Sequence, residues 1–123
     1  MKRILIVDDE PNIRESLQII LSKHGYDVDI ACDGLDALEK FKAAPFDVVI
    51  TDIVMPKEDG MGLVLQLRNI SARVKLITMS GGGKYVDPVT YLNMSKALGV
   101  DFCFTKPIDN EYLINTIEKL LMK

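Results

Sequence analysis

The sequence predicts an α/β fold in which a parallel five-stranded sheet is covered by helices on both faces. Three observations lead to this expectation. Five short runs rich in Val, Ile and Leu recur along the chain, stretches with helical spacing separate them, and several runs are apolar without alternation. Continuous apolar strands are typical of a sheet buried on both faces. Strands that alternate with helices favour an α/β sandwich.

The expected strands are short and rich in β-branched residues. The first, third and fourth have continuous apolar cores, namely Ile4–Val7, Val48–Ile50 and Leu76–Met79. Such cores are expected for strands that lie between two helical layers. The five strands are expected at Arg3–Val7, Asp27–Ala31, Asp47–Thr51, Val74–Met79 and Val100–Phe104.

Each expected strand is followed by a stretch whose apolar residues recur every three or four positions, which is the spacing of an amphipathic helix. Gly25, Pro45 and Gly99 stand at the joints between elements, and Asp33 and Asp109 stand where helix N-caps are expected. The periodic residues of the five expected helices are Ile13, Leu17, Ile20 and Leu21; Leu35, Leu38 and Phe41; Leu63 and Leu67; Tyr91, Met94 and Leu98; and Leu113, Ile117, Leu120 and Leu121.

Five strand–helix units predict a flavodoxin-like (βα)5 three-layer sandwich with the strand order 2-1-3-4-5. In this order the direction of winding changes between strands 1 and 3, and ligands bind beyond the carboxyl ends of the strands at that point. We expect residues 1–123 to form one domain, because a chain of 123 residues can bury a core without disulfides or a structural metal.

The composition argues against several classes of protein. A net charge of −3 gives no basic footprint for nucleic acid or for an anionic membrane. The first apolar run ends at Asp8, too early to span a bilayer. Cys32 and Cys103 belong to no CxxC or Cys/His cluster, so they predict neither a disulfide framework nor a zinc site. Cys32 is expected to be a small buried residue, and a reducing cytoplasm is the expected compartment.

Carboxylates stand at the ends of the two strands that flank the switch point. Asp8 and Asp9 follow the first strand, and Asp52 follows the third. If these three side chains converge, their mutual repulsion amounts to several kcal/mol at an effective dielectric constant of about 20. Hard oxygen ligands in a small site suit Mg²⁺. The alternative is that Asp8-Asp9-Glu10 only stabilises the start of the first helix through the helix dipole.

The fourth and fifth strands end in residues that suit a phosphoryl group. Ser80 is followed by Gly81-Gly82-Gly83, so a hydroxyl and backbone N–H groups are available to phosphoryl oxygens. Lys106, before Pro107, places a cation beside the acids, and lysine binds phosphate as a point charge.

Taken together, these segments resemble the receiver domains of bacterial two-component response regulators. The segments that carry the resemblance are Val7-Asp8-Asp9-Glu10, Asp52 through Gly60, Ser80-Gly81 and Thr105-Lys106-Pro107. The resemblance covers essentially the whole chain, and we expect a stand-alone receiver domain.

The resemblance also implies a role for each site residue. Asp52 matches the phosphoacceptor, Asp9 a direct metal ligand, and Asp8 an acid that holds the metal mainly through water. The backbone carbonyl of Val54 would be a further metal ligand. Ser80 and Lys106 match the groups that bind the phosphoryl oxygens. The implied cofactor is Mg²⁺, with Asp52 as a ligand too, and the Lys106-Pro107 bond is expected to be cis.

The implied function is a phosphorylation switch. A sensor histidine kinase or a histidine phosphotransfer protein would supply the phosphoryl group, and the domain would act only on itself rather than turn over as an enzyme. The output would pass to a downstream protein through the face built from the fourth helix, fifth strand and fifth helix, with no direct contact to nucleic acid or membrane. Receivers usually carry an aromatic residue where this chain has Cys103, so transmission through an aromatic switch is not expected.

Other functions fit the sequence less well. An FMN carrier of the same topology needs a phosphate-binding loop after the first strand, where Asp8-Asp9-Glu10 would repel the ligand. A phosphatase of the haloacid dehalogenase type needs an acid at position 54, which is Val. A receiver-like interaction module that works without phosphorylation stays open as the alternative.

Overall fold

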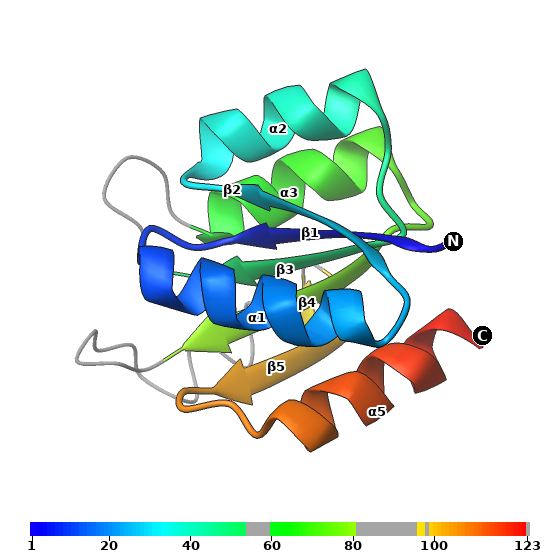
Figure 1. Ribbon diagram of the computed structural model, residues 1–123. Coiled ribbons are helices and arrows are strands. Elements are labelled where there is room, and N and C mark those ends of the chain that lie inside the picture. Colours follow the sequence, from blue (N-terminus) through cyan, green and yellow to red (C-terminus); the bar gives the residue numbers. More distant parts are fainter. Residues whose placement is uncertain (54–59, 81–95, 98, 123) are drawn as a thin grey trace.

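The computed structural model describes residues 1–53, 60–80, 96–97 and 99–122. Within them lies a parallel five-stranded sheet of order β2-β1-β3-β4-β5 (Figure 1). The elements are β1 (Arg3–Val7), α1 (Pro11–Lys23), β2 (Asp27–Ala31), α2 (Gly34–Ala43), β3 (Val48–Asp52), α3 (Gly60–Ile70), β4 (Lys75–Ser80), β5 (Phe102–Thr105) and α5 (Asn110–Leu121). The predicted fold class and strand order are therefore confirmed.

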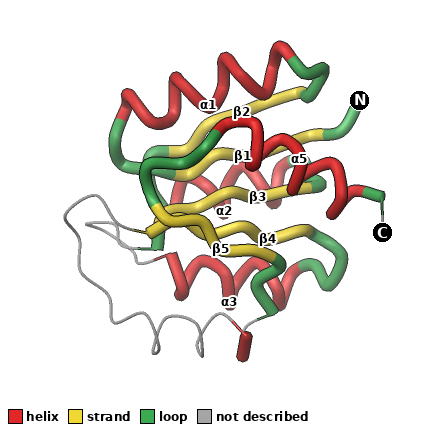
Figure 2. Tube along the Cα trace, turned by 90° about the horizontal axis from the view of Figure 1, so that it is seen from below, coloured by secondary structure: helices red, strands yellow, loops and turns green. Residues whose placement is uncertain are grey.

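Helices cover both faces of the sheet, α2 and α3 on one and α1 and α5 on the other (Figure 2). Alternate strand residues point to opposite faces. Leu5 and Val49 pack with α2 and α3, whereas Ile4 and Ile50 pack with α1 and α5. All four of these side chains are fully buried. This double burial explains why the strands read as continuous apolar runs.

Two of the predicted strands have the predicted bounds, and three are displaced. Strand β3 begins at Val48 rather than Asp47, although the Asp47 N–H donates to the Arg3 carbonyl at 2.8 Å and the Asp47 carbonyl accepts from the Lys75 N–H at 2.9 Å. Strand β4 begins and ends one residue later than predicted, and β5 begins at Phe102. The predicted helix of Tyr91, Met94 and Leu98 and the glycine stretch after Ser80 lie outside the described residues.

The predicted start and stop signals are confirmed. The Asp33 carboxylate accepts a hydrogen bond from the Asp36 N–H at 2.9 Å, and Asp109 accepts from the N–H groups of Glu111 and Tyr112. Gly25, which follows α1, has a φ of 87°, a left-handed conformation that favours glycine. These local signals fix where α2 and α5 begin and how the chain leaves α1.

The predicted burial of Cys32 is wrong, because this residue is exposed. Leu35 fits the helical spacing but is 62% exposed on the first turn of α2. Ala37, Leu38 and Phe41 carry the buried face of that helix instead. None of the helices in the described ranges has the length and apolar character that crossing a bilayer would require.

At the amino end of the sheet, two arginines bind backbone carbonyl groups. Arg3 Nη1 donates to the carbonyl oxygens of Ala44 and Pro45 at 2.9 and 2.8 Å. Arg68 donates through Nη1 to the carbonyls of Ala72 and Val74 and through Nη2 to that of Gly99, at 3.0, 2.9 and 2.7 Å. These contacts tie the turns that lead into the strands to one another.

Candidate functional site

The strand register places the chain segments that follow four neighbouring strands at one edge of the sheet. Val7, the last residue of β1, pairs with Thr51 of β3, and Asp52 pairs with Met79 of β4. Ser80, at the end of β4, pairs with Thr105 of β5. The backbone N–H of Lys106 donates to the Ser80 carbonyl at 2.7 Å, which extends this pairing past β5. The topology therefore brings the predicted site residues of the four strands to one place.

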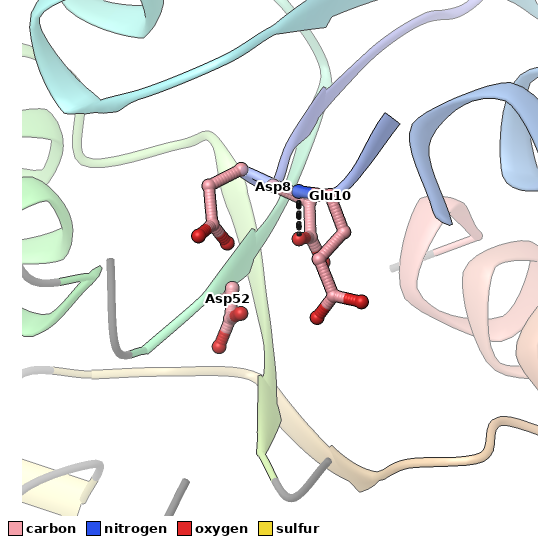
Figure 3. A group of neighbouring side chains, drawn as sticks. Asp8, Glu10 and Asp52 are labelled. Carbon is pink, nitrogen blue, oxygen red and sulfur yellow. Dashed lines mark hydrogen bonds between the residues drawn. The ribbon is translucent and has the colours of Figure 1, made fainter. Parts of the chain in front are cut away.

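The predicted convergence of acids is confirmed. One carboxylate oxygen from each of Asp8, Asp9, Glu10 and Asp52 lies within 4.8 Å of the others. Figure 3 shows Asp8, Glu10 and Asp52 gathered where β1 and β3 end. Asp8 is fully buried and Asp52 is 2% exposed. Because burial weakens solvent screening, these carboxylates repel one another more than they would on an open surface.

Lys106 is the cation that the structure pairs with this cluster. Its Nζ lies 3.0 Å from Asp8 Oδ2, 3.2 Å from Asp52 Oδ2 and 3.6 Å from Glu10 Oε1. Burial by itself lowers the pKa of the Lys106 ammonium, but its hydrogen bond to Asp8 and the charges of Asp8 and Asp52 outweigh that effect. The pKa is raised as a result, so the ammonium is firmly charged at neutral pH.

Asp8 is the most constrained member of the cluster. Its Oδ1 accepts the backbone N–H of Glu10 at 2.9 Å, and its Oδ2 accepts from Lys106. Burial nevertheless raises the pKa of the Asp8 carboxyl, and the charge of Asp52 raises it further. The hydrogen bond from Glu10 and the ammonium of Lys106 oppose this rise without cancelling it. The Lys106 ammonium therefore does not offset the effect of burial on Asp8.

The donor set fits a small hard cation. Four carboxylates supply oxygen ligands, which Mg²⁺ prefers, and their excess of negative charge would be relieved by a divalent ion. Asp8, Asp9 and Asp52 are the predicted ligands among them, and Glu10 lies within the same cluster. The Val54 carbonyl, also predicted as a ligand, lies outside the described residues.

The predicted phosphoryl-binding groups border the acids. Ser80 ends β4, and Lys106 follows β5. The Lys106-Pro107 peptide bond is cis, as predicted. Cys103 pairs in register with Thr78, while Phe102 and Phe104 on the opposite face of β5 pack against Tyr112 of α5. Neither Phe102 nor Phe104 therefore replaces the aromatic residue that receivers usually carry at the position of Cys103.

Two residues near the site were not predicted. Glu10 was expected only as part of the helix start, yet its carboxylate belongs to the cluster and it makes no side-chain cap hydrogen bond for α1. Arg14 donates through Nη1 to the backbone carbonyl of Asp8 at 2.7 Å. The contact of Arg14 could have been predicted from its position. It lies one helical turn after the N-cap residue Glu10, and helical side chains lean toward the N-terminus of the helix.

The fold and the acidic site together define a receiver domain of the two-component type. The family model of the response regulator receiver domain matches residues 4–118, and the chain belongs to this family.

Among curated relatives, the transcriptional regulatory protein DltR of Streptococcus agalactiae is 34% identical over 115 residues, which are 94% of this chain and 50% of that protein. The probable transcriptional regulator ycf27 of Guillardia theta is 39% identical over 122 residues, which are 99% of this chain and 46% of that protein. The chain thus spans about half the length of the curated relatives it matches.

Solved receiver structures resemble the whole chain. The response regulator TrrA from Thermotoga maritima, solved in complex with Mg²⁺-BeF, is 37% identical with a TM-score of 0.83, and the match covers 98% of this chain and 99% of that one. A CheY-like receiver protein from Methanospirillum hungatei is 32% identical with a TM-score of 0.90, covering 99% and 95% of the two chains.

Proposed function

We propose that this receiver domain accepts a phosphoryl group on the carboxylate of Asp52 in a reaction that depends on Mg²⁺. The observation that carries the proposal is the cluster of four carboxylate oxygens within 4.8 Å, beside the Lys106 ammonium at 3.0 and 3.2 Å from Asp8 and Asp52. The Mg²⁺-BeF complex of TrrA adds support from a similar protein.

In the proposed reaction, an Asp52 carboxylate oxygen attacks the phosphorus of a phosphohistidine on a partner kinase or phosphotransfer protein. A P–O bond forms as the P–N bond breaks, and its electron pair stays on the imidazole nitrogen, which takes a proton from water. Asp8, Asp9 and Asp52 would hold the metal, with the Val54 carbonyl as a further ligand. When bound, the metal neutralises charge on the phosphoryl oxygens.

Lys106 and Ser80 complete the site in this proposal. The Lys106 ammonium lies 3.2 Å from Asp52 Oδ2 and would bind a phosphoryl oxygen once Asp52 is modified. The Ser80 hydroxyl would donate to a second oxygen. The domain would therefore catalyse only its own phosphorylation and dephosphorylation and would not be an enzyme with an external substrate.

The proposed output is a protein-binding surface. Phe102 of β5 and Tyr112 of α5 form an edge-to-face pair with ring centroids 5.6 Å apart, and Tyr112 is 54% exposed. Aromatic groups that are partly exposed suit protein recognition, so the β5–α5 side is the proposed docking face for a downstream protein. Two free thiols fit the cytoplasm, the compartment we propose.

Phosphorylation with acetyl phosphate tests this function. With MgCl₂ present, intact mass spectrometry should detect one added phosphoryl group on the wild type, and none on Asp52→Asn. Asp33→Asn is the matched control, because Asp33 follows the neighbouring strand β2 and asparagine preserves the N-cap of α2; it should be labelled like the wild type. Labelling of Asp52→Asn would refute the assignment. A wild type that resists labelling by both acetyl phosphate and histidine kinases would favour the phosphorylation-independent interaction module.

A further inference from the structure

The backbone and side chain of Asp8 are held at four points. Its N–H donates to the Ala31 carbonyl at 3.2 Å, Oδ1 accepts from the Glu10 N–H at 2.9 Å, and Oδ2 accepts from Lys106 at 3.0 Å. The fourth contact, from Arg14 Nη1 to the Asp8 carbonyl oxygen, is the shortest at 2.7 Å. Arg14 thus contacts the acidic site through the backbone carbonyl of Asp8.

The start of α1 places Arg14 close to the turn between β1 and α1. Glu10 occupies the N-cap position without a side-chain hydrogen bond, and the first turn of α1 contains no acidic residue. The N–H of Arg14 bonds the Glu10 carbonyl at 3.2 Å and closes the first turn. A side chain at that position leans back toward the N-terminus, so the guanidinium reaches the turn between β1 and α1.

Fixing the Asp8 carbonyl also fixes Asp9. The Asp8 carbonyl and the Asp9 N–H belong to one planar peptide unit, so the direction of the carbonyl determines the direction in which the Asp9 Cα leaves. The half-buried Asp9 carboxylate then meets those of Asp8 and Asp52. Mutual repulsion of the carboxylates favours a rotated peptide that separates them. The bond to Arg14 opposes that rotation.

We propose that Arg14 is a positioning residue for the divalent cation, which sets the Asp8–Asp9 peptide so that two carboxylates face the ion before it binds. The inference rests on the proposed function, because it assumes that the cluster binds Mg²⁺. It assigns Arg14 no contact with the ion or with the phosphoryl group. Groups that orient metal ligands typically change metal affinity by about 10- to 100-fold when they are removed.

Arg68 supplies a matched control at the opposite end of the sheet. Like Arg14, it donates to backbone carbonyls, those of Ala72, Val74 and Gly99. Those carbonyls belong to turns at the amino end of β4 and before β5, where none of the clustered acids lies. Loss of Arg68 should therefore reduce stability without changing the affinity for the ion.

Titration calorimetry with MgCl₂ on the full chain, together with urea unfolding of the metal-free protein, tests the proposal. Arg14→Met should raise the Kd for Mg²⁺ by about tenfold or more, whereas Arg68→Met should leave the Kd within about twofold of the wild type and lower the urea midpoint. Arg14→Lys, which keeps a charged donor, should recover part of the affinity. The amide resonance of Asp9 in the metal-free protein should move in Arg14→Met and not in Arg68→Met.

The proposal is overturned if folded Arg14→Met binds Mg²⁺ with the wild-type Kd, or if Arg68→Met weakens binding equally. Should Arg14→Met not fold, Arg14→Gln takes its place, with a shorter neutral side chain and the same expected loss of affinity; an unchanged Kd in that variant would also overturn the proposal. A wild type that binds no Mg²⁺ would refute both the proposed function and this inference. If the wild type binds Mg²⁺ and the Arg14 variants bind it equally well, only this inference is refuted.

Discussion

At the amino end of the sheet each of two guanidinium groups meets one carboxylate, whereas at the carboxyl end one ammonium meets three. Arg3 Nε lies 3.5 Å from Asp27 and Arg68 Nη2 lies 3.5 Å from Asp101. Lys106 forms ion pairs with Asp8, Glu10 and Asp52. Among the described residues, these amino-end pairs match one cation to one carboxylate, whereas the ion pairs of Lys106 set three carboxylates against one ammonium.

Burial makes this difference larger. The side chains of Arg3 and Asp27 are 31% and 58% exposed, so water screens their interaction, and such pairs contribute about 0–1 kcal/mol. The side chains of Lys106 and Asp8 are 8% and 0% exposed. Ions removed from water depend on their partners in the protein. The comparison teaches that the same sheet can carry exposed, simple ion pairs at one end and, at the other, a buried group of acids whose negative charge a cation would relieve.

The largest expected effect on stability follows from removing the Lys106 ammonium. In metal-free protein, Lys106→Met removes the ammonium from the buried carboxylates of Asp8 and Asp52. Loss of one partner of a buried ion pair lowers the free energy of unfolding by about 3–5 kcal/mol. Urea denaturation measures the loss. Arg68→Met, which removes hydrogen bonds at the amino end, should cost less, about 1–3 kcal/mol. If Lys106→Met and Arg68→Met lose the same free energy of unfolding, the two ends of the sheet do not differ in this way.

Next in size is a backbone change at the amino end. Gly25 has a φ of 87°, and an added Cβ would meet no heavy atom within 4 Å. Gly25→Ala should therefore lower the free energy of unfolding by about 1–2 kcal/mol through backbone strain alone, and the Kd for Mg²⁺ should not change. Chemical denaturation and metal titration of the same variant check both statements. A weakened metal site would mean that the two ends are coupled.

The smallest effects concern the two helices that begin at the carboxyl end. Asp109 caps α5 through two N–H groups, so Asp109→Ala should cost about 1 kcal/mol. Glu10 has the same N-cap position on α1 but makes no side-chain cap bond, so Glu10→Ala should change the stability of the metal-free protein much less. Thermal melts of the two variants compare these losses. A larger loss for Glu10→Ala would indicate that Glu10 stabilises the turn in a way the contacts above do not explain.

The parts of the fold that the sequence predicted depend on short-range signals. The strands read as continuous apolar runs because helices cover both faces, and Asp33 and Asp109 precede their helices directly. The meeting of Asp8, Asp9 and Asp52 followed from the strand order together with the positions of the acids at strand ends. Here, residue type and topology rules were sufficient.

Other features depend on partners that are distant in sequence or on local geometry that a periodic pattern does not specify. Asp47 precedes β3, and its carboxylate accepts a hydrogen bond from the backbone N–H of Arg3, 44 positions away. Leu35 fits the helical period, but the first turn of α2 leaves it exposed while Ala37 is buried. Cys32 lies at the turn before α2, where its N–H bonds the Asp36 carboxylate. The Arg14 guanidinium binds the Asp8 carbonyl, a contact that helical spacing alone does not specify.

The claim that the carboxyl end is completed by a cation is tested most directly by the melting temperatures of wild type and Asp8→Asn, each with and without MgCl₂. Burial raises the pKa of Asp8 above its ordinary value of 3.8, so the ionised carboxylate destabilises the metal-free fold. This penalty is absent below pH 3.8, grows as pH rises through the raised pKa and is complete above it.

At neutral pH without metal, Asp8→Asn should therefore melt at a higher temperature than the wild type. With Mg²⁺ at about 100 times its Kd, binding should add about 2.7 kcal/mol to the wild type and much less to the variant, so the order should reverse. Asp101→Asn, an acid at the amino end, should melt lower in both conditions by the same amount. A wild type that is insensitive to Mg²⁺, or an Asp8→Asn variant that is less stable in both conditions, would contradict the account.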